Sequence, residues 1–266
     1  MSAGTRPPQD TAQHGAQGAA HSGPRAGQGD APSASAEAAA VTRRYARRDT
    51  TRDAQRYSLL NPAALAMHQE RQRALTRLLA RQGWPDLRGA RILEVGCGSG
   101  GNLLDLLRLG AQAELLTGLE LLPERAAAAR ACLPAALRVI EGDALAAPIE
   151  PASQDIVLQA TVFSSLLDDA FQQRLADALW QWLAPGGGLL WYDFVFDNPA
   201  NRDVRGVPLS RVRQLFPQGR IVEAHRVTLA PPLARAACRL SPSLYPLLNA
   251  LPLLRTHRLL WIARPH

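Results

Sequence analysis

The chain has 266 residues, a formal net charge of +7 and three cysteines. This length suffices for one α/β domain with appendages, and the sequence contains no apolar run long enough to form a transmembrane segment. The cysteines lack the spacing of metal ligands, so we expect a reduced, cytoplasmic protein without a metal site.

The positive charge is unevenly distributed. All 30 basic residues are arginines, and ten of them lie between Val204 and His266, where Glu223 is the one acid. This bias indicates either a genome that encodes arginine for every cation or a surface that faces anions, such as a phosphorylated substrate or an anionic membrane. Nucleic acid is not expected as a partner, because the few aromatic residues are not interleaved with the arginines.

Two segments precede the first expected strand. After its first residue, the segment 1–40 contains no Leu, Ile, Val or aromatic side chain. Such a segment cannot bury enough apolar surface to offset its ordering entropy, so it predicts a disordered N-terminal tail, and it has no apolar core of a secretory signal. Residues 41–84 have helical periodicity interrupted at Asn61-Pro62, which predicts an N-terminal helical cap on a domain that spans 41–266.

The stretch Arg91–Asn102 is the most informative part of the chain. Ile92–Val95 predicts a short buried strand, four glycines then predict a tight turn, and a helix opens at Asn102. A strand, a glycine turn and a helix N-terminus form a nucleotide-cofactor site, because glycines let the backbone approach the ligand and free helix N–H groups point at it.

Two cofactors compete for this geometry. Gly96, Gly98 and Gly101 satisfy the spacing of dinucleotide sites, whereas Glu94, Gly96, Gly98 and Gly100 match the form that binds S-adenosylmethionine (SAM). The glycines alone therefore leave the choice open.

Strands and helices are then expected to alternate. The expected strands are Leu115–Glu120, Leu137–Glu141, Asp155–Gln159, Leu189–Phe194, Arg220–Leu229 and Arg258–Ala263, and the expected helices are Pro123–Ala131, Asp168–Leu183 and Leu209–Phe216. Strands separated by helix-length segments predict a doubly wound, parallel sheet whose ligand lies at the C-terminal ends of the strands.

The ends of the second and third strands favour SAM over a nicotinamide cofactor. Glu120 ends the second strand about 20 residues after the last glycine, where a carboxylate accepts hydrogen bonds from both ribose hydroxyls of either cofactor. Asp143 ends the third strand, where it can accept a hydrogen bond from the adenine amino group, and Ala144 leaves room for the ring. Leu183–Gly188 then supplies a helix stop and a turn before the fifth strand.

In this order and spacing, the motifs resemble those of class I SAM-dependent methyltransferases over roughly residues 85–195. The resemblance implies a Rossmann-like sheet of seven mostly parallel strands with helices on both faces, an antiparallel last strand and an insertion at 230–256. It also implies a cofactor site in which Glu94 and Gly96 contact the amino-acid end of SAM, Gly98 and Gly100 line the cleft, Glu120 holds the ribose, Asp143 and Ala144 hold the adenine, and Gln159 lies beside the methionine moiety and faces the acceptor.

The whole chain further resembles methyltransferases found among bacterial polysaccharide and cell-envelope genes. This resemblance rests on Thr161–Ser165, Tyr192–Phe194, Asp197–Pro199 and Val227–Pro232. It implies a small-molecule or glycolipid-type acceptor, which the arginine-rich tail suggests is anionic.

The acceptor atom is not determined by the sequence. If it is a hydroxyl, a base is useful, and the candidates are Asp193, Asp197, His225 and His257. We rank Asp193 first, because it ends the fifth strand on the ligand side of the sheet.

Two flanking segments are expected to build the acceptor pocket. The helical cap carries Tyr45 and Tyr57, which form either an aromatic lid over the cofactor or a packing contact. The insertion 230–256, with Arg235 and Arg239 on one helical stripe, is either a lid that receives an amphipathic acceptor at a membrane surface or a cap that completes the core.

The leading interpretation is a SAM-dependent methyltransferase acting on a small or envelope-precursor acceptor, with O-methylation as one option. Two alternatives stay open: a nicotinamide-dependent oxidoreductase, and a non-catalytic methyltransferase-like protein that binds a partner through its arginine-rich tail.

Overall fold

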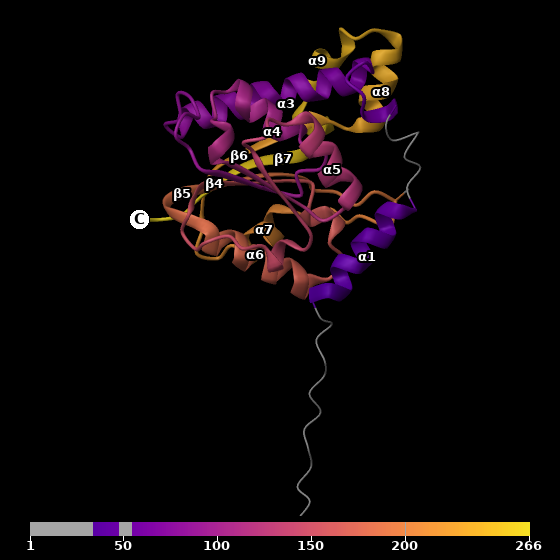
Figure 1. The fold of residues 1–266 in the computed structure, drawn as a ribbon. Coiled ribbons are helices and arrows are strands. Elements are labelled where there is room, and N and C mark those ends of the chain that lie inside the picture. The colour runs from indigo at the N-terminus through magenta and orange to yellow at the C-terminus, as the bar shows by residue number, and fades with distance from the viewer. Residues whose placement is uncertain (1–33, 48–54, 200) are drawn as a thin grey trace, which may run out of the picture. The chain divides into compact units, whose positions relative to one another are not determined.

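A mixed seven-stranded sheet forms the centre of the computed structural model, which describes residues 34–47, 55–199 and 201–266 (Figure 1). Its strands are β1 (Ile92–Val95), β2 (Leu116–Glu120), β3 (Arg138–Glu141), β4 (Gln154–Ala160), β5 (Leu183–Phe194), β6 (Arg220–Leu229) and β7 (Arg255–Ala263). They are arranged in the order β3-β2-β1-β4-β5-β7-β6, with β7 antiparallel to both of its neighbours. The predicted Rossmann-like sheet with an antiparallel last strand is confirmed.

The strand order reverses direction beside β1. From β1 the chain passes to β2 and β3 on one side, and it then returns to β4 on the other side. In open α/β sheets, ligands bind in the crevice at the C-terminal ends of the strands next to such a reversal. The glycine turn after β1 lies at this point.

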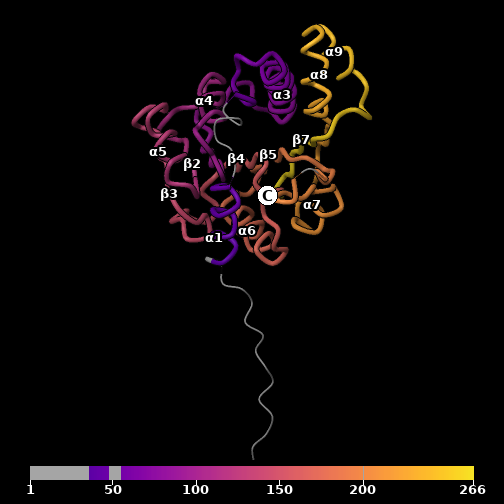
Figure 2. Tube along the Cα trace, turned by 90° about the vertical axis from the view of Figure 1, so that its right-hand side faces the viewer, coloured from indigo at the N-terminus to yellow at the C-terminus, as the bar shows by residue number. Residues whose placement is uncertain are grey.

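Helices cover both faces of the sheet, as predicted (Figures 1 and 2). The helices are α1 (Ala34–Ala46), α3 (Pro62–Arg81), α4 (Gly101–Arg108), α5 (Pro123–Cys132), α6 (Asp169–Trp182), α7 (Leu209–Leu215), α8 (Pro231–Leu240) and α9 (Leu244–Asn249), with 3₁₀ turns η1 (Ala113–Leu115), η2 (Ala144–Ala146), η3 (Phe163–Ser165) and η4 (Pro252–Leu254). One buried core lies under α1, α6 and α7, and a second lies under α3, α4 and α5. None of the helices in the described ranges is long and apolar enough to cross a membrane.

The turn expected over Leu183–Gly188 is a bulge inside β5. Leu183 pairs with Gln154, but the next paired residues are Gly188 and Ile156, so four residues of β5 leave the ladder. Gly186 has a φ of 79°, which favours glycine, and its N–H donates to the carbonyl of Arg264. The glycines therefore let β5 start six residues earlier than the hydrophobic pattern indicated.

The N-terminal boundary of the folded part also differs from the expected one. The helix α1 begins at Ala34, so a boundary at residue 41 falls within it. Glu37 accepts the N–H of Leu167 at 2.9 Å, and Ala38 is buried. Alanines can pack a helix against a core without any large apolar side chain, which is why the composition did not reveal this segment. The rest of the expected tail, 1–33, and part of the expected helical cap, 48–54, lie outside the described residues.

The insertion between β6 and β7 forms a small helical subdomain. Its helices α8 and α9 pack against the start of α3, where Ala63, Ala234, Cys238 and Tyr245 share a third buried core with Leu229. The N–H of Ala230 donates to the carbonyl of Leu254 at 2.9 Å and closes the neck of the insertion. Since β6 ends and β7 begins at the C-terminal edge of the parallel strands, the subdomain rises from the edge that carries the glycine turn.

Candidate active site

The glycine turn after β1 adopts backbone conformations that side chains disfavour. Gly96, Gly98 and Gly100 have φ values of 69°, 57° and 86°. A Cβ on Gly96 would lie 2.5 Å from Cγ2 of Val162, so this glycine is also required for packing. A Cβ on Gly98 would meet no atom within 4 Å. The turn is therefore tight against the protein at Gly96 and open at Gly98.

Glu120, at the end of β2, supports the turn from below. Its Oε2 accepts the N–H of Gly98 at 2.7 Å, and its Oε1 accepts the N–H of Leu122 at 2.9 Å. Each carboxylate oxygen has a second lone pair, so both can still accept a hydroxyl. The expected ribose-binding carboxylate thus lies beside the open glycine.

Glu94 is completely buried within β1, and only one of its two carboxylate oxygens has a hydrogen-bond partner among the described residues. Its Oε1 accepts a hydrogen bond from Nδ2 of Asn102 at 2.6 Å, whereas its Oε2 has no partner among the described residues. Burial raises the pKa of Glu94 to about 7, with Glu120 adding to the rise and Arg71 opposing it. A buried carboxylate oxygen without a donor is costly, so this position calls for a cationic or hydrogen-bonding ligand.

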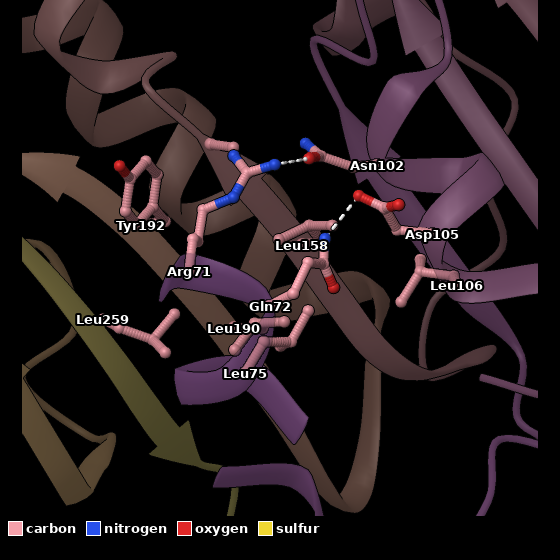
Figure 3. A pocket seen from close by; sticks show the side chains of 11 residues that line it. Arg71, Gln72, Leu75, Asn102, Asp105, Leu106, Leu158, Leu190, Tyr192 and Leu259 are labelled. Atoms are coloured by element: carbon pink, nitrogen blue, oxygen red, sulfur yellow. Dashed lines mark hydrogen bonds between the residues drawn. The ribbon is translucent and has the colours of Figure 1, made fainter. Parts of the chain in front are cut away.

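Arg71 of α3 is a site residue that the sequence did not reveal. It donates to Oδ1 of Asn102 at 2.6 Å, and its guanidinium lies 5.2 Å from the ring centroid of Tyr192 (Figure 3). These side chains line a cavity of about 20 Å³ between α3 and the sheet, which is enough for one water molecule. Arg71 lies 21 positions before Ile92, the first residue of β1, so no motif spacing connects it to the glycine turn.

Asp143 and Ala144 lie where the third strand was expected to place them. Asp143 follows β3, is half-buried, and accepts the N–H of Leu145 through Oδ1 at 3.0 Å. The N–H of Gly142 donates to the carbonyl of Glu120 at 2.9 Å, which joins the ends of β2 and β3. Glu120 and Asp143, which were assigned to the ribose and the adenine, therefore lie at the C-terminal ends of adjacent strands.

The residues present fit SAM on two observations. The space over Gly98 gives a nucleoside room to approach the backbone, and the unpartnered oxygen of Glu94 matches the ammonium group of a methionine moiety. Cys97, inside the turn, is buried with a raised pKa, because desolvation and the nearby carboxylates disfavour its thiolate. It is a small packing residue and no nucleophile.

Comparison with known proteins agrees with this geometry. Residues 92–187 match the family model of a methyltransferase domain. This range contains the glycine turn, the ends of β2 and β3, and all of β4.

Residues 92–187 are a methyltransferase domain. The groups at its glycine turn fit SAM as the cofactor. No curated protein sequence matches the chain.

Solved structures share the fold of this methyltransferase domain at low sequence identity. A SAM-dependent methyltransferase from Mesorhizobium loti is 16% identical with a TM-score of 0.51, and the match covers 71% of this chain and 96% of that one. A SAM-dependent methyltransferase from Archaeoglobus fulgidus is 14% identical with a TM-score of 0.52, and the match covers 75% of this chain and 98% of that one. The [4+2]-cyclase SpnF also matches, with 17% identity, a TM-score of 0.52 and coverage of 73% and 82%. The fold thus accommodates more than one reaction.

Gln159 and Asp193 are both turned toward the backbone of the methyltransferase domain. Gln159 is fully buried, and its Oε1 accepts the N–H of Val162 at 3.2 Å. Asp193 is also fully buried, with Oδ2 accepting the N–H of Ser164 at 3.1 Å and Oδ1 that of Phe194 at 3.0 Å. Burial raises the pKa of Asp193 to about 7. Asp193 holds the turn after β4 in place and has no exposed atom that faces an acceptor.

His257 is better placed for a base than the residue ranked first from the sequence. It stacks on Tyr192 with ring centroids 5.0 Å apart, and its Nδ1 lies 3.0 Å from Oγ1 of Thr256. No hydrogen bond from the described residues reaches its Nε2. Burial, with Arg71 adding, lowers the pKa of His257 to about 4, so the ring is neutral at pH 7. His225 instead binds Glu223 at 2.6 Å.

The two tyrosines of the cap and Asp197, which were also expected near the acceptor, differ in their surroundings. Tyr45 is partly buried, with the guanidinium of Arg125 over its ring at 4.5 Å, whereas Tyr57 is 67% exposed. Asp197 accepts the N–H of Gly206 at 2.8 Å in the loop after β5. Within the described ranges, no group of three His, Cys, Asp or Glu side chains could hold a metal ion.

Proposed function

We propose that this protein transfers the methyl group of SAM to a hydroxyl of an anionic small molecule or glycolipid-type envelope precursor. One observation carries the proposal: Glu94, Asn102, Arg71, Tyr192 and His257 form a continuous row of contacting or charge-coupled side chains. The row leads from the carboxylate that suits the amino-acid end of the cofactor to a neutral imidazole.

The cofactor-binding roles follow from this row and from the strand ends. Glu94 would pair with the ammonium of the methionine moiety, and Arg71 would attract its carboxylate. Glu120 would accept the ribose hydroxyls and Asp143 the adenine amino group, with Gly98 and Ala144 leaving room for the nucleoside. When bound, SAM supplies a methyl group on a positively charged sulfur, which is electrophilic without further activation.

The protein's contribution to the chemistry would be alignment and proton removal. His257 would take the hydroxyl proton on Nε2 while the new O–CH₃ bond forms and the S–CH₃ bond breaks. The proposal requires the tautomer in which Nδ1 donates to Oγ1 of Thr256 and Nε2 carries the lone pair, and the 3.0 Å contact between these two atoms allows it. Tyr192 would hold the ring in place by stacking, and its own hydroxyl is fixed 2.8 Å from Oγ1 of Thr228.

Arginines on the last two strands support an anionic acceptor. Arg226 and Arg258 lie directly opposite each other on β6 and β7, and no acidic side chain follows Glu223 in the chain. Burial and the charge of Arg226 lower the pKa of Arg258. Like charges in such a cross-strand pair repel, so a bound anion would relieve the repulsion.

The proposal is tested in two stages. Calorimetry with SAM and S-adenosylhomocysteine should show binding in the micromolar range. Reaction with SAM carrying a deuterated methyl group, against a panel of sugar phosphates and polyprenyl-linked sugars, should then yield a methyl ether detected by mass spectrometry. A folded protein that gives no heat with either cofactor form would end the methyltransferase proposal, and a methylated amine would end its hydroxyl part.

A further inference from the structure

The helical subdomain between β6 and β7 exposes an unusual number of large apolar side chains. Together with the segment just before α3, it carries seven of the ten large apolar residues that are exposed among the described residues. They are Tyr57, Leu59, Leu60, Leu240, Leu247, Leu251 and Leu253, with exposed fractions between 49% and 94%. Exposed apolar side chains concentrated on two segments of a globular protein are typical of an interaction surface.

These two segments are neighbours in the fold. Ala63, at the start of α3, shares a buried core with Ala234 and Cys238 of α8, and both views show α8 and α9 beside α3 (Figures 1 and 2). Tyr57 is close enough to Arg235 to influence its ionisation. The segments that carry these exposed side chains therefore lie side by side, and we call the seven apolar side chains, with Arg235 and Arg239, the docking face.

Positive charge accompanies the apolar side chains. Arg235 and Arg239 form no ion pair within the described ranges, and Arg239 is exposed. Burial lowers the pKa of Arg235, and the charges of Arg56 and Arg239 lower it further. No acidic residue occurs anywhere between Glu223 and the end of the given sequence, so the subdomain itself contains no counter-charge.

This charge pattern distinguishes between two occupants. A two-fold symmetric dimer through the docking face would bring arginines against arginines without an acid to pair with them. The surface of an anionic bilayer offers phosphates for the arginines and acyl chains for the leucines at once.

We propose that the docking face binds the surface of an anionic membrane, with Leu240, Leu247 and Leu253 entering the headgroup region. The neck of the insertion lies at the C-terminal edge of the sheet, so docking would bring the active-site edge close to the lipid headgroups. This inference concerns binding alone and holds whether or not the acceptor proposed above is correct.

Vesicle sedimentation of the full chain tests the inference. Wild-type protein should pellet with vesicles of phosphatidylcholine and phosphatidylglycerol but weakly with phosphatidylcholine alone. Replacing both arginines (Arg235→Gln with Arg239→Gln) should weaken binding about 30-fold, at roughly fivefold for each basic side chain near an anionic leaflet. Replacing two exposed leucines (Leu247→Ser with Leu253→Ser) should also weaken it, and low salt should not restore the loss.

Matched controls separate the docking face from general charge and hydrophobicity. Arg213→Gln with Arg220→Gln removes the same charge from exposed positions on α7 and β6, and Val222→Ser removes an exposed apolar side chain from β6. All variants should keep the melting temperature and SAM affinity of the wild type, which shows that they fold. The inference is overturned if wild-type protein does not pellet with anionic vesicles, or if the control variants lose as much binding as the docking-face variants. A dimer that the leucine substitutions dissolve would likewise overturn it in favour of self-association.

Discussion

The guanidinium of Arg71 donates to Oδ1 of Asn102 at 2.6 Å, and Nδ2 of the same amide donates to Oε1 of Glu94 at 2.6 Å. One amide thus connects α3 of the N-terminal cap to the first strand of the sheet. The cap is therefore part of the proposed cofactor site.

Replacing Arg71 should weaken SAM binding. The variant Arg71→Met loses a charge-assisted hydrogen bond to Asn102 and the positive charge proposed to attract the cofactor's carboxylate, so we expect the dissociation constant to rise about tenfold. Calorimetry measures this, with Arg77→Met as the control on the exposed side of the same helix. Equal losses in both variants would contradict a specific role for Arg71.

Glu94 should make stability and cofactor affinity depend on pH. Its pKa is raised to about 7 in the folded protein from an unfolded value of 4.5, so the native state holds the extra proton between these values and loses stability as the pH rises through them. The variant Glu94→Gln should therefore be more stable than wild type above pH 7, by roughly 1–3 kcal/mol, in denaturant titrations without cofactor.

Cofactor binding should show the opposite pH trend at the same residue. The ionised form of Glu94 pairs with the ammonium group, so SAM affinity of the wild type should rise as the pH increases toward 7. In Glu94→Gln, affinity should be lower and nearly independent of pH across that range. A wild-type affinity that does not change between pH 5 and pH 8 would remove Glu94 from the site.

Replacing Glu120 tests the proposed contact with the ribose of the cofactor. We expect Glu120→Ala to cost on the order of 2 kcal/mol of SAM binding, because two charge-assisted hydrogen bonds to the ribose are lost. The exposed Glu124→Ala, on the neighbouring helix, is the control. Thermal-shift titration with NAD should show no stabilisation of the wild type, and stabilisation by NAD but not by SAM would favour the oxidoreductase alternative.

His257 should affect turnover more than binding. Once an acceptor is identified, His257→Gln should lower kcat about 100-fold while SAM affinity stays constant, since the residue is proposed to remove a proton. The pKa of His257 is about 4, so the ring stays neutral from pH 6 to pH 8. Its ionisation should therefore cause no change in the wild-type rate across this range. His225→Gln is the matched control, and a similar loss there would argue against a specific base.

Truncation should distinguish the two possible starts of the domain. Deleting residues 1–31 keeps Glu37 and Ala38, so we expect an unchanged melting temperature. Deleting 1–40 removes the bond from Glu37 to the N–H of Leu167 and its ion pair with Arg44, and the melting temperature should fall by about 2–4 °C for each kcal/mol lost. Identical melting of both truncated proteins would show that the first half of α1 adds nothing.

Local patterns in the sequence determined the sheet, its order of elements and the cofactor turn. Strand β1, the glycines after it and the acids at the ends of β2 and β3 are consecutive features, and each depends on backbone chemistry that neighbouring residues dictate. The helix caps at Asn61 and Asp168 are local in the same sense, because each side chain bonds a backbone N–H two or three residues ahead.

Only the tertiary structure decided which side chains share the site. Long-range packing brings together Arg71 of the cap, Asn102 of α4, and Tyr192 and His257 of β5 and β7. Asp193 shows the converse: it ends a strand at the expected edge, yet side chains alternate between the faces of a strand, and its face is filled by the turn after β4. The position of a residue along the chain predicts at which edge of the sheet it lies. The burial and orientation of its side chain, which decide its chemistry, depend on which distant segments pack against that side chain.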